Sequence, residues 1–545
     1  MSIEVPAGIL PGEHLHALRA RLRGDLLLPG DDGWDDARRA WQLTVDQNPT
    51  AVAIPADVDD VAIVVTAARR FGLRVAPQST GHAAGALRSL DDTILLRTSR
   101  LRDVDIDPAV GTARVGSGAV WGDVAAAAAM HDLAAVAGMA ASVGVVGFVL
   151  GGGVGWLGRS HGRGIDSVLA VEAVDARGRV LRIDRQRNAD LFEGLRAGIA
   201  PVIVTAVTLQ LHPLAEIWAG GLMWPLDRAA DVVHAWHAWI GAVPDTVTSL
   251  VRVLRFPPLP DLPEAMRGQQ FVAVEAAVHA DAEEVAALLA PLRALAPTVD
   301  SMRPMPPAEL ATVHGDPPQP SPAFGESVLL AELSEVAVAG FLDAALAPAS
   351  GALLSVELRH LGGALTPDVP GDALAFAVGI VPVPEAAPNA LRDLSPLTAK
   401  PVLYVCNVAE DEAALRGELV EQLGGRIACA QASDATIAAI DKMHQDMLAL
   451  YAKRDRLDYF KLNQAIHTAI VALSGNATLI WAHEAIQARM KHIRFIGNAG
   501  PEKWAGAVAE HEQMVAALRK RDGAALARVL KLHLDKTLER VRDQI

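Results

Sequence analysis

A long stretch without a single charged residue limits the folds open to this chain more than any other feature. It runs from Leu133 to Gly158 and reads LAAVAGMAASVGVVGFVLGGGVGWLG. A helix of that length would suffice to cross a membrane, and Gly147 and Gly151 form a small-xxx-small pair typical of packed membrane helices. The glycine triplet at 151–153 argues against such a helix, because each glycine costs about 1 kcal/mol relative to alanine. We therefore expect glycine-rich loops in a globular domain and no membrane partner.

Apolar patterns on both sides of this stretch predict a mixture of helices and strands. Apolar residues at helical spacing follow an acidic first turn between Asp57 and Phe71, which predicts a helix. Apolar and polar residues alternate around the turn at 176–178, so VLAVEAVDARGRVLRID is expected to form a hairpin. Further strands are predicted at LRVAP, DTILLRT, GTARVGSGAV and VIVTAVTLQLHPL, and a further helix at WGDVAAAAAMHDL. This part of the chain is therefore expected to be α+β.

The pattern changes further along the chain. From about Ile217 to Ala387, strand and helix patterns are interrupted by proline-rich stretches near 257–263 and 317–322. From about Glu412 onward, long amphipathic helices with few breakers predict an all-α region. A chain of 545 residues exceeds the usual size of one core, so several folding units are expected.

Charge and cysteine usage exclude some classes of function. The formal net charge of −15 argues against direct nucleic-acid binding, which needs a positive field. Cys406 and Cys429 cannot form a disulfide framework and do not have metal-ligand spacing. The N-terminal segment does not have the pattern of a secretory signal, so a cytoplasmic protein is expected.

His82 lies in the turn QSTGHAAG, where packing does not call for an imidazole. One interpretation is an ordinary histidine in a surface loop, since single histidines are common there. The other is chemical: small residues let the backbone approach phosphates, and a neutral imidazole is a usable nucleophile.

Four segments between about Asp46 and Pro213 favour the chemical interpretation. They read PQSTGHAAG, GSGAVWGDV, SVGVVGFVLGGGVGWLGRSHG and DLFEGLR. Their order resembles the FAD-binding domain of the vanillyl-alcohol oxidase and p-cresol methylhydroxylase (PCMH) family, with berberine-bridge-like bacterial oxidases as the most similar branch. The resemblance implies that the turn holds the FAD pyrophosphate and that His82 links covalently to the 8α carbon of the flavin.

The same resemblance implies a set of flavin-binding residues. Ala140 stands where some relatives carry a cysteine that forms a second covalent link, so one link is expected. The alternative for the glycine-rich part is a loop packed against a neighbouring strand. The expected cofactor-binding residues are Ser79, Thr80, Gly81, His82, Ala83, Ser142, Val143, Gly144, Val145, Gly147, Gly151, Gly152 and Gly153.

One loop departs from the family pattern. The segment LRAGIAPVIVT places Ile199 and Pro201 where the family has a flexible run of glycines. Because proline restricts the backbone, the chain there is expected to close against the cofactor.

The segment LLSVELRHLGGAL resembles the substrate domain of the same oxidases, in which this strand lies over the flavin. Strand alternation places Glu357 and Arg359 on one face and Leu358 and His360 on the other. Glu357 or His360 could accept a substrate proton while a hydride passes to the flavin, so Glu357, Arg359 and His360 are the candidate catalytic residues. The alternative is a Glu–Arg pair on a solvated sheet face. Nothing after Pro384 matches the C-terminal segment that covers the flavin in relatives.

The helical region carries a second constellation. Asn463 and His467 are four residues apart and share one helix face, while His511 and His533 lie on two later predicted helices. Three imidazoles and a side-chain oxygen suit a divalent metal such as Zn²⁺, with one or more positions left open.

From about Ala414 onward the chain resembles the ligand-binding (FCD) domain of GntR-type regulators of the FadR class. The segments that carry this resemblance are LGGRIACAQASDATIAAI, YFKLNQAIHTAIVALSGNATL and AVAEHEQMVAALRKRDGAALARVLKLHL. It implies a metal held by Asn463 and the three histidines, and a small carboxylate effector that completes the metal's ligands.

Other residues of this region have open roles. Arg489 and Arg494 are either clamps for the effector carboxylate or ordinary solvated helix charges. His483 and His492 fall outside the metal pattern and are expected at the surface. No basic recognition-helix pattern precedes Ala414, so the DNA-binding head of such regulators is not expected.

Together these features predict a PCMH-type α+β FAD-binding domain and an α+β substrate domain, followed by an all-α bundle. The expected function is FAD-dependent oxidation of a small organic substrate. The alternative is a metal- and carboxylate-binding sensor with a compromised oxidase portion, and a third possibility is a recombined chain that performs neither task. Apolar helix faces make a homodimer a reasonable expectation. The predicted parts are an N-terminal helical or irregular segment (1–45), the FAD-binding domain (46–215), an incomplete substrate domain (216–390), a linker (391–412) and the FCD-like domain (413–545).

Overall fold

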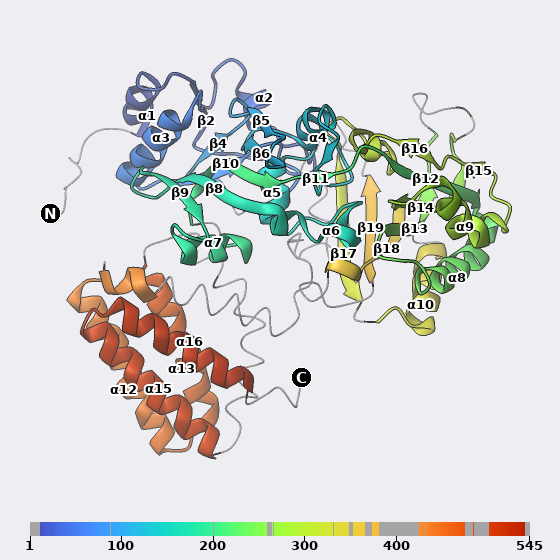
Figure 1. Cartoon of the computed structure of the whole chain (residues 1–545). Helices are drawn as coiled ribbons and strands as arrows, with labels where there is room; N and C mark the ends of the chain where they lie inside the picture. Colours follow the sequence, from blue (N-terminus) through green and yellow to red (C-terminus); the bar gives the residue numbers. More distant parts are fainter. Residues whose placement is uncertain are drawn as a thin grey trace. The chain divides into compact units, whose positions relative to one another are not determined.

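The structure is a computed structural model of the whole chain (Figure 1). The chain folds into two compact units, each described below by itself. The first comprises Met1–Phe192 and Val202–Asn407, and the second comprises Glu193–Pro201 and Val408–Ile545. The structure describes residues 11–87, 89–199, 201–258, 264, 266–330, 332–347, 353–365, 373–380, 425–430, 432–474, 483 and 501–539.

The first unit begins with a small sheet whose strands run in the order β1-β2-β4-β3. The helix predicted between Asp57 and Phe71 is α3 (Val58–Phe71), which shares an apolar core with this sheet. Asp57 caps the start of α3 by accepting a hydrogen bond from the backbone N–H of Asp60, and Gly72 ends the helix in the left-handed conformation. Helix α1 (Pro11–Arg19) contributes to the same core through Leu15 and Leu18. The strands are β1 (Asp25–Leu27), β2 (Ala51–Ile54), β3 (Arg74–Gln78) and β4 (Thr93–Arg97).

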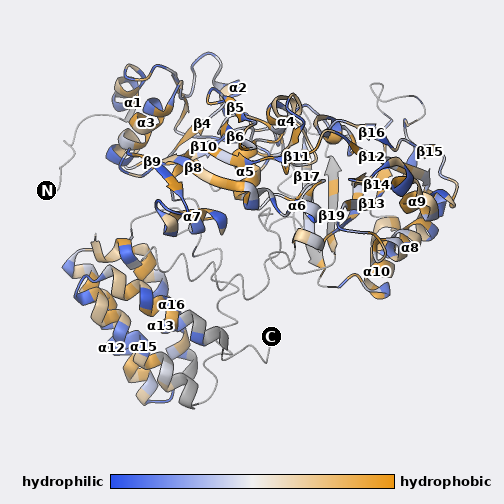
Figure 2. Cartoon of the chain, in the orientation of Figure 1, coloured by the Kyte–Doolittle hydropathy of each residue, from blue (hydrophilic) through white to orange (hydrophobic). Residues whose placement is uncertain are grey.

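A second, antiparallel sheet follows in the order β5-β6-β10-β8-β9. The predicted hairpin is present, with β8 and β9 joined across the turn at 176–178. The predicted helix at WGDVAAAAAMHDL is α4 (Trp121–Ala129), whose first turn is capped by Asp123. The strands are β5 (Val104–Asp107), β6 (Thr112–Gly116), β8 (Val168–Val174), β9 (Val180–Asp184) and β10 (Ile203–Gln210). Figure 2 shows apolar residues along β8 and β10.

The uncharged stretch does not form one helix. It contains the short strand β7 (Leu133–Ala134) and the helix α5 (Val145–Leu150), and α6 (Gly158–His161) begins at its end. Gly152 and Gly153 have φ angles of 98° and 74°, which end the helical path after α5. Among the described residues, no helix is both long enough and apolar enough to cross a membrane.

A third, antiparallel sheet has the strand order β15-β12-β14-β13-β18-β19-β17, with β16 also paired to β12. Helices α8 (Ala229–Ile240), α9 (Ala282–Arg293) and α10 (Glu335–Leu346) share a core with it that includes the buried Trp224 and Trp236 (Figure 1). The strands are β12 (Ile217–Pro225), β13 (Val247–Arg255), β14 (Gln270–Val278), β15 (Val299–Asp300), β16 (Arg303–Met305), β17 (Ala323–Leu330), β18 (Leu353–His360) and β19 (Ala373–Ile380).

Backbone contacts join the third sheet's loops to the N-terminal part of this unit. The Ser321 N–H donates to the Trp41 carbonyl at 3.1 Å, and the Leu43 N–H donates to the Ser321 carbonyl at 3.0 Å. Trp41 and Gln42 also bind the turn that holds His82. The Trp41 N–H donates to the Thr80 carbonyl at 2.9 Å, and the Gln42 N–H donates to the Gly81 carbonyl at 3.4 Å. Residues 41–43 therefore place the start of β17 beside the candidate flavin turn.

The second unit is helical wherever it is described as regular structure, as predicted. Its helices are α12 (Asp434–Ala452), α13 (Arg456–Ala472), α15 (Pro501–Arg519) and α16 (Gly523–Glu539), and residues 425–430 are also helical. They share an apolar core around Met447, Ile466, Met514 and Leu530. Ser433 caps α12 by accepting from the Thr436 N–H.

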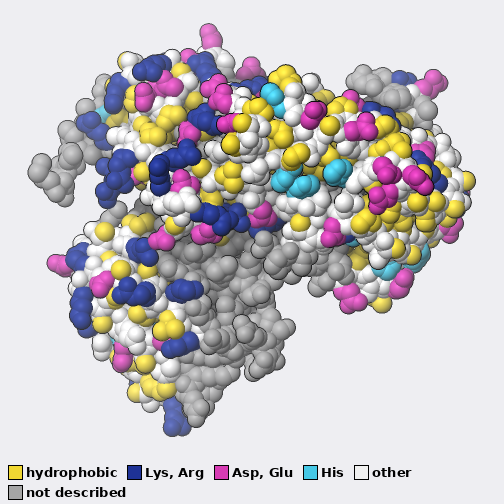
Figure 3. All heavy atoms as spheres, in the orientation of Figure 1, with side chains coloured by type: hydrophobic (Ala, Val, Ile, Leu, Met, Phe, Trp, Pro, Cys, Tyr) yellow, Lys and Arg dark blue, Asp and Glu magenta, His cyan; other side chains and the backbone are white. Residues whose placement is uncertain are grey.

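Acidic and basic side chains are interspersed on the face of the chain shown in Figure 3. Ion pairs with one exposed partner include Arg102–Asp123 at 2.7 Å and Arg179–Asp175 at 2.6 Å. Such pairs contribute little to stability individually, because solvent screens them.

Candidate functional site

The candidate flavin turn follows β3 and places His82 in a partly buried position. Gly81 has a φ of 91°, and a Cβ at this position would lie 2.9 Å from Ala40, so only glycine fits. The His82 ring stacks on Trp41 with ring centroids 4.1 Å apart, and its Nδ1 lies 2.6 Å from Thr80 Oγ1. His82 is therefore a partly buried loop residue whose ring packs on a neighbouring indole, and its role toward a flavin stays a prediction.

Burial determines the protonation state of His82. It lowers the pKa of the imidazole to about 4, although the nearby charge of Asp316 acts in the opposite direction. The Nε2 atom is shielded from solvent and has no hydrogen-bond partner among the described residues. The imidazole is therefore neutral near pH 7, which is the state that a nucleophilic nitrogen requires.

The structure brings the two predicted flavin-binding segments together. A Cβ on Gly144 would lie 2.9 Å from Ser79 Oγ, so any larger residue would force Ser79 to shift where 142–145 meets the candidate turn. Val143 and Val145 are held by backbone bonds to Trp121 and Ala119, at 3.0 and 3.1 Å. Ser79 and Gly144 therefore converge from positions far apart in the sequence.

The glycines after Gly144 have different surroundings. A Cβ on Gly153 would lie 2.4 Å from the Phe148 ring, so this glycine serves packing, although against a side chain rather than the predicted strand. Gly151 donates to the Gly147 carbonyl at 3.2 Å and ends α5. Beside Gly147 and Gly152, by contrast, a Cβ would meet no described atom within 4 Å. The shielded imidazole, the Ser79–Gly144 approach and the space beside Gly147 together fit a backbone cradle for a flavin.

The loop that departs from the family pattern holds Ile199 in a buried position, and the Ile199 N–H donates to the Gly194 carbonyl at 2.8 Å. Ala200 lies outside the described residues. The expectation that this loop closes against the cofactor remains a prediction.

Glu357 lies at the centre of a buried charge network on the third sheet. Its side chain is fully buried, its Oε1 accepts from Arg359 Nε at 2.7 Å, and its Oε2 lies 3.1 Å from His314 Nε2. Burial would raise the pKa of Glu357, but the charges of Arg359 and His314 outweigh it and hold the pKa far below its usual range. The alternative of a solvated Glu–Arg pair is therefore wrong, because the sheet face that carries Glu357 is covered.

His314 connects Glu357 to the candidate flavin turn. Its Nδ1 lies 2.7 Å from Asp316 Oδ1, and Asp316 is the residue whose charge acts on His82. Burial and Arg252 oppose protonation of His314, but Glu357 and Asp316 overcome both and raise its pKa to about 9. At neutral pH the site thus holds an imidazolium between two carboxylates.

Arg252 extends the network to a neighbouring strand. It lies opposite Glu357 in the β13–β18 register, donates to the His314 carbonyl at 2.7 Å and pairs with Glu275 on β14. Burial raises the pKa of Glu275, whose Oε2 has no described hydrogen-bond partner. Sequence reasoning missed Arg252, Glu275, His314 and Asp316. The signal for Arg252 and Glu275 is a charge flanked by apolar residues within a strand, since a buried charge requires a partner.

His360 does not join this network. Burial, with a smaller contribution from Arg159, lowers its pKa to about 3. Strand alternation explains why His360 lies apart from Glu357. His360 shares a face of β18 with Leu358, and Leu358 packs into the core that the helices cover. Of the three candidate catalytic residues, the structure brings together Glu357 and Arg359 only.

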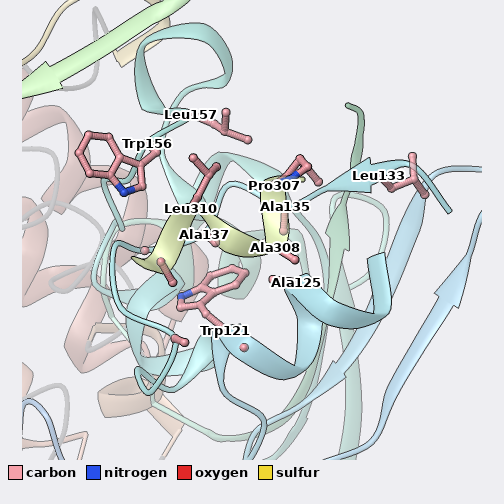
Figure 4. Close-up of a pocket in the computed structure, with 15 residues that line it drawn as sticks. Trp121, Ala125, Leu133, Ala135, Ala137, Trp156, Leu157, Pro307, Ala308 and Leu310 are labelled. Carbon is pink, nitrogen blue, oxygen red and sulfur yellow. The ribbon is translucent and has the colours of Figure 1, made fainter. Parts of the chain in front are cut away.

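A separate apolar pocket lies beside α4 (Figure 4). Trp121, Trp156 and Leu310 line it together with small residues, and Pro307 and Ala308 contribute from the short helix η4 (Pro307–Thr312). None of its lining residues is titratable near neutral pH. This pocket therefore supplies no acid–base chemistry to the site.

In the second unit, the predicted metal-ligating residues converge. His467, His511 and His533 come from α13, α15 and α16, are fully buried, and each offers a ring nitrogen within 4.8 Å of the other two. Asn463 Nδ2 lies 2.9 Å from His511 Nε2. A 180° turn of the amide would place its oxygen at that position, since amide oxygen and nitrogen are interchangeable in shape. This donor set fits Zn²⁺ or a similar transition metal.

One expectation about the other histidines is wrong. His483 is buried, with 2% of its surface exposed, rather than lying at the surface. His492, Arg489, Arg494, Cys406 and the predicted linker lie outside the described residues.

Comparisons with known proteins agree with both groups of motifs. Residues 49–184 match the family model of the FAD binding domain, and residues 416–536 match that of the FCD domain. The chain therefore joins an FAD-binding domain to a C-terminal FCD domain, as the motifs predict.

Individual relatives match the oxidase portion. The (R)-6-hydroxynicotine oxidase of Paenarthrobacter nicotinovorans is 31% identical over 205 residues, which cover 37% of this chain and 45% of that protein. The FAD-dependent monooxygenase FUP4 of Fusarium proliferatum is 32% identical over 180 residues, or 33% of this chain and 35% of that protein. The matches thus span less than half the length of these curated relatives. The crystal structure of 6-hydroxy-D-nicotine oxidase from Arthrobacter nicotinovorans superposes with a TM-score of 0.59 at 25% identity, covering 68% of this chain and 83% of that one.

Proposed function

We propose that this chain is an FAD-dependent oxidoreductase that oxidises a small organic substrate, with the flavin tethered through His82. The observation that carries the proposal is the shielded, neutral His82 beside the Ser79–Gly144 approach, connected through Asp316 and His314 to Glu357. When bound, a flavin supplies an acceptor for hydride.

The residues of the chain have distinct tasks in this proposal. His82 offers a nitrogen lone pair for the covalent link, because burial keeps the ring neutral. Ion pairs fix the charged side chains of Glu357, Arg359 and His314 at the sheet face. These charges orient a polar substrate, and the side chains do not have to rearrange when it binds. Glu357 is a weak base there, because its ion pairs hold the pKa low. Its contribution is therefore charge and orientation, in place of the proton acceptance expected from the sequence.

The test is the visible absorption spectrum of the purified protein, repeated on pellet and supernatant after acid precipitation. A yellow pellet for the wild-type protein and a colourless pellet for His82→Ala are expected. His131→Ala is the matched control, because His131 is an exposed histidine of the same domain, and its pellet should stay yellow. A yellow supernatant above a colourless wild-type pellet would refute the covalent link but would still show that the protein binds FAD. A colourless purified protein would refute the proposed oxidoreductase function.

A second candidate function rests on the helical unit. The convergence of three buried imidazoles favours a metal- and carboxylate-binding sensor of the GntR-regulator type, attached to an oxidase portion that is catalytically compromised. Metal analysis of wild-type and His467→Ala protein after dialysis tests it. Bound metal in a colourless wild-type protein would select this function, bound metal in a yellow protein would support both, and the absence of metal would exclude the sensor.

A further inference from the structure

Glu510 makes a buried contact with one histidine of the candidate metal centre. It precedes His511 on α15, and only 3% of its surface is exposed. Its Oε2 lies 2.7 Å from Nδ1 of His533 on α16, and its Oε1 accepts from Lys536 Nζ at 3.2 Å. One carboxylate thus contacts a buried imidazole on one side and a partly exposed ammonium on the other.

This contact has a consequence for the tautomer of His533. A carboxylate accepts hydrogen bonds, so Nδ1 must carry the proton that it donates to Glu510. The lone pair of a neutral ring then lies on Nε2. Because Nδ1 is engaged by Glu510, Nε2 is the nitrogen that His533 would contribute to the cluster with His467 and His511. The same bond fixes the orientation of the ring about its side-chain torsions.

We propose that Glu510 is a positioning residue of the metal centre, which selects the tautomer of His533 and directs its Nε2 toward the bound ion. This inference rests on the metal-binding function proposed above and extends it to a residue that does not contact the metal. Loss of such an outer contact typically lowers metal affinity 10- to 100-fold.

The competing explanation is a purely structural ion pair between α15 and α16. In that case Glu510 would matter through its charge contact with Lys536, and its loss would lower the stability of the metal-free protein without changing the metal site. The two explanations differ in what Lys536→Gln does, because this substitution removes the outer ion pair and keeps the Glu510–His533 bond.

The experiment uses full-length protein stripped with a chelator and titrated with Co²⁺, whose visible spectrum reports ligand number and geometry, and with Zn²⁺ in competition. Glu510→Gln should bind about 10- to 100-fold more weakly than wild type and show an altered Co²⁺ spectrum. Lys536→Gln should stay close to wild type. Glu512→Gln is the matched control, because Glu512 is an exposed glutamate two positions along the same helix, and it should have no effect.

Each outcome decides a different point. Equal affinities and spectra for wild type and Glu510→Gln would overturn the role of Glu510, while the proposed metal-binding function would still hold. A similar loss of affinity in Lys536→Gln and Glu510→Gln would also overturn the proposal, because the affinity would then depend on the ion pair with Lys536 rather than on the Glu510–His533 bond. A wild-type protein that binds neither ion would overturn the metal-binding function and this inference with it. If Glu510→Gln does not fold, Glu510→Asp replaces it, since the shorter side chain withdraws the carboxylate from Nδ1, and unchanged affinity there would also overturn the proposal.

Discussion

At the scale of single residues, burial has opposite outcomes for two histidines of the first unit. His82 has only the charge of Asp316 to offset burial, so its pKa falls to about 4. His314 is more deeply buried but contacts two carboxylates, so its pKa rises to about 9. The difference arises from partners rather than depth, because paired charge compensates for desolvation and unpaired charge does not.

The raised pKa of His314 predicts a pH-dependent contribution to stability. A group whose pKa is higher in the folded state stabilises the protein fully below its ordinary pKa, and this contribution is lost as the pH rises through the folded value. A rise from 6.5 to about 9 corresponds to on the order of 3 kcal/mol. The stability advantage of wild type over His314→Gln should therefore shrink by up to about this amount between about pH 6 and pH 9.5.

Thermal unfolding of both proteins across that pH range measures the effect. The groups that face His314 are Glu357, Asp316 and Arg252, and all three remain in the variant. Parallel stability curves for the two proteins would show that His314 does not change its protonation state between the folded and unfolded protein over this range.

At the scale of elements, the glycine-rich segment around α5 combines two kinds of position. The Phe148 ring packs under three glycines, where a Cβ on Gly138, Gly153 or Gly164 would approach the ring to 2.8, 2.4 and 2.9 Å. Gly147, the residue before Phe148 on α5, faces open space instead. Packing thus accounts for the three glycines around Phe148, whereas the cofactor role predicted for Gly147 stays a prediction.

Alanine substitutions at Gly153 and Gly147 separate these roles. Gly153→Ala should destabilise the fold by about 2–4 kcal/mol, because alanine is strained at positive φ and its Cβ would overlap the Phe148 ring. Gly147→Ala should change stability by less than about 1 kcal/mol but lower the flavin content, since its methyl group would occupy the space left for the cofactor. Melting temperature and flavin absorbance after desalting measure both effects. Full flavin content in Gly147→Ala would remove this residue from the cradle.

At the scale of the whole molecule, the chain contains two compact units with separate apolar cores. The buried charge network belongs to the first unit, and the histidine cluster belongs to the second. A ligand that binds only the folded form of one unit should therefore stabilise that unit alone.

Metal addition provides a test of this separation. At a free Zn²⁺ concentration about 100-fold above the dissociation constant, the helical unit should gain about 2.7 kcal/mol. Scanning calorimetry with Zn²⁺ and with a chelator should then show one transition that shifts and one that does not, and His467→Ala should abolish the shift. A shift of both transitions together would show that the units unfold as one.

The sequence alone determined the features that depend on local pattern. Periodicity predicted helix α3, the β8–β9 hairpin and the all-α second unit, because helix and strand repeats are properties of neighbouring residues. Motifs predicted the FAD-binding and FCD domains. Asn463 and His467 could be paired in advance because they lie one helical turn apart.

Only the tertiary structure decided the features that join distant segments. The register of three strands brings together Arg252, Glu275 and Glu357, and His314 contacts Glu357 from a loop. The spacing of these residues in the sequence therefore does not predict the network. Ser79 and Gly144 are likewise far apart in the sequence, and so are Glu510 and His533. Burial of Glu357 and His483 was likewise invisible, because exposure depends on what covers a residue and the covering elements come from elsewhere in the chain.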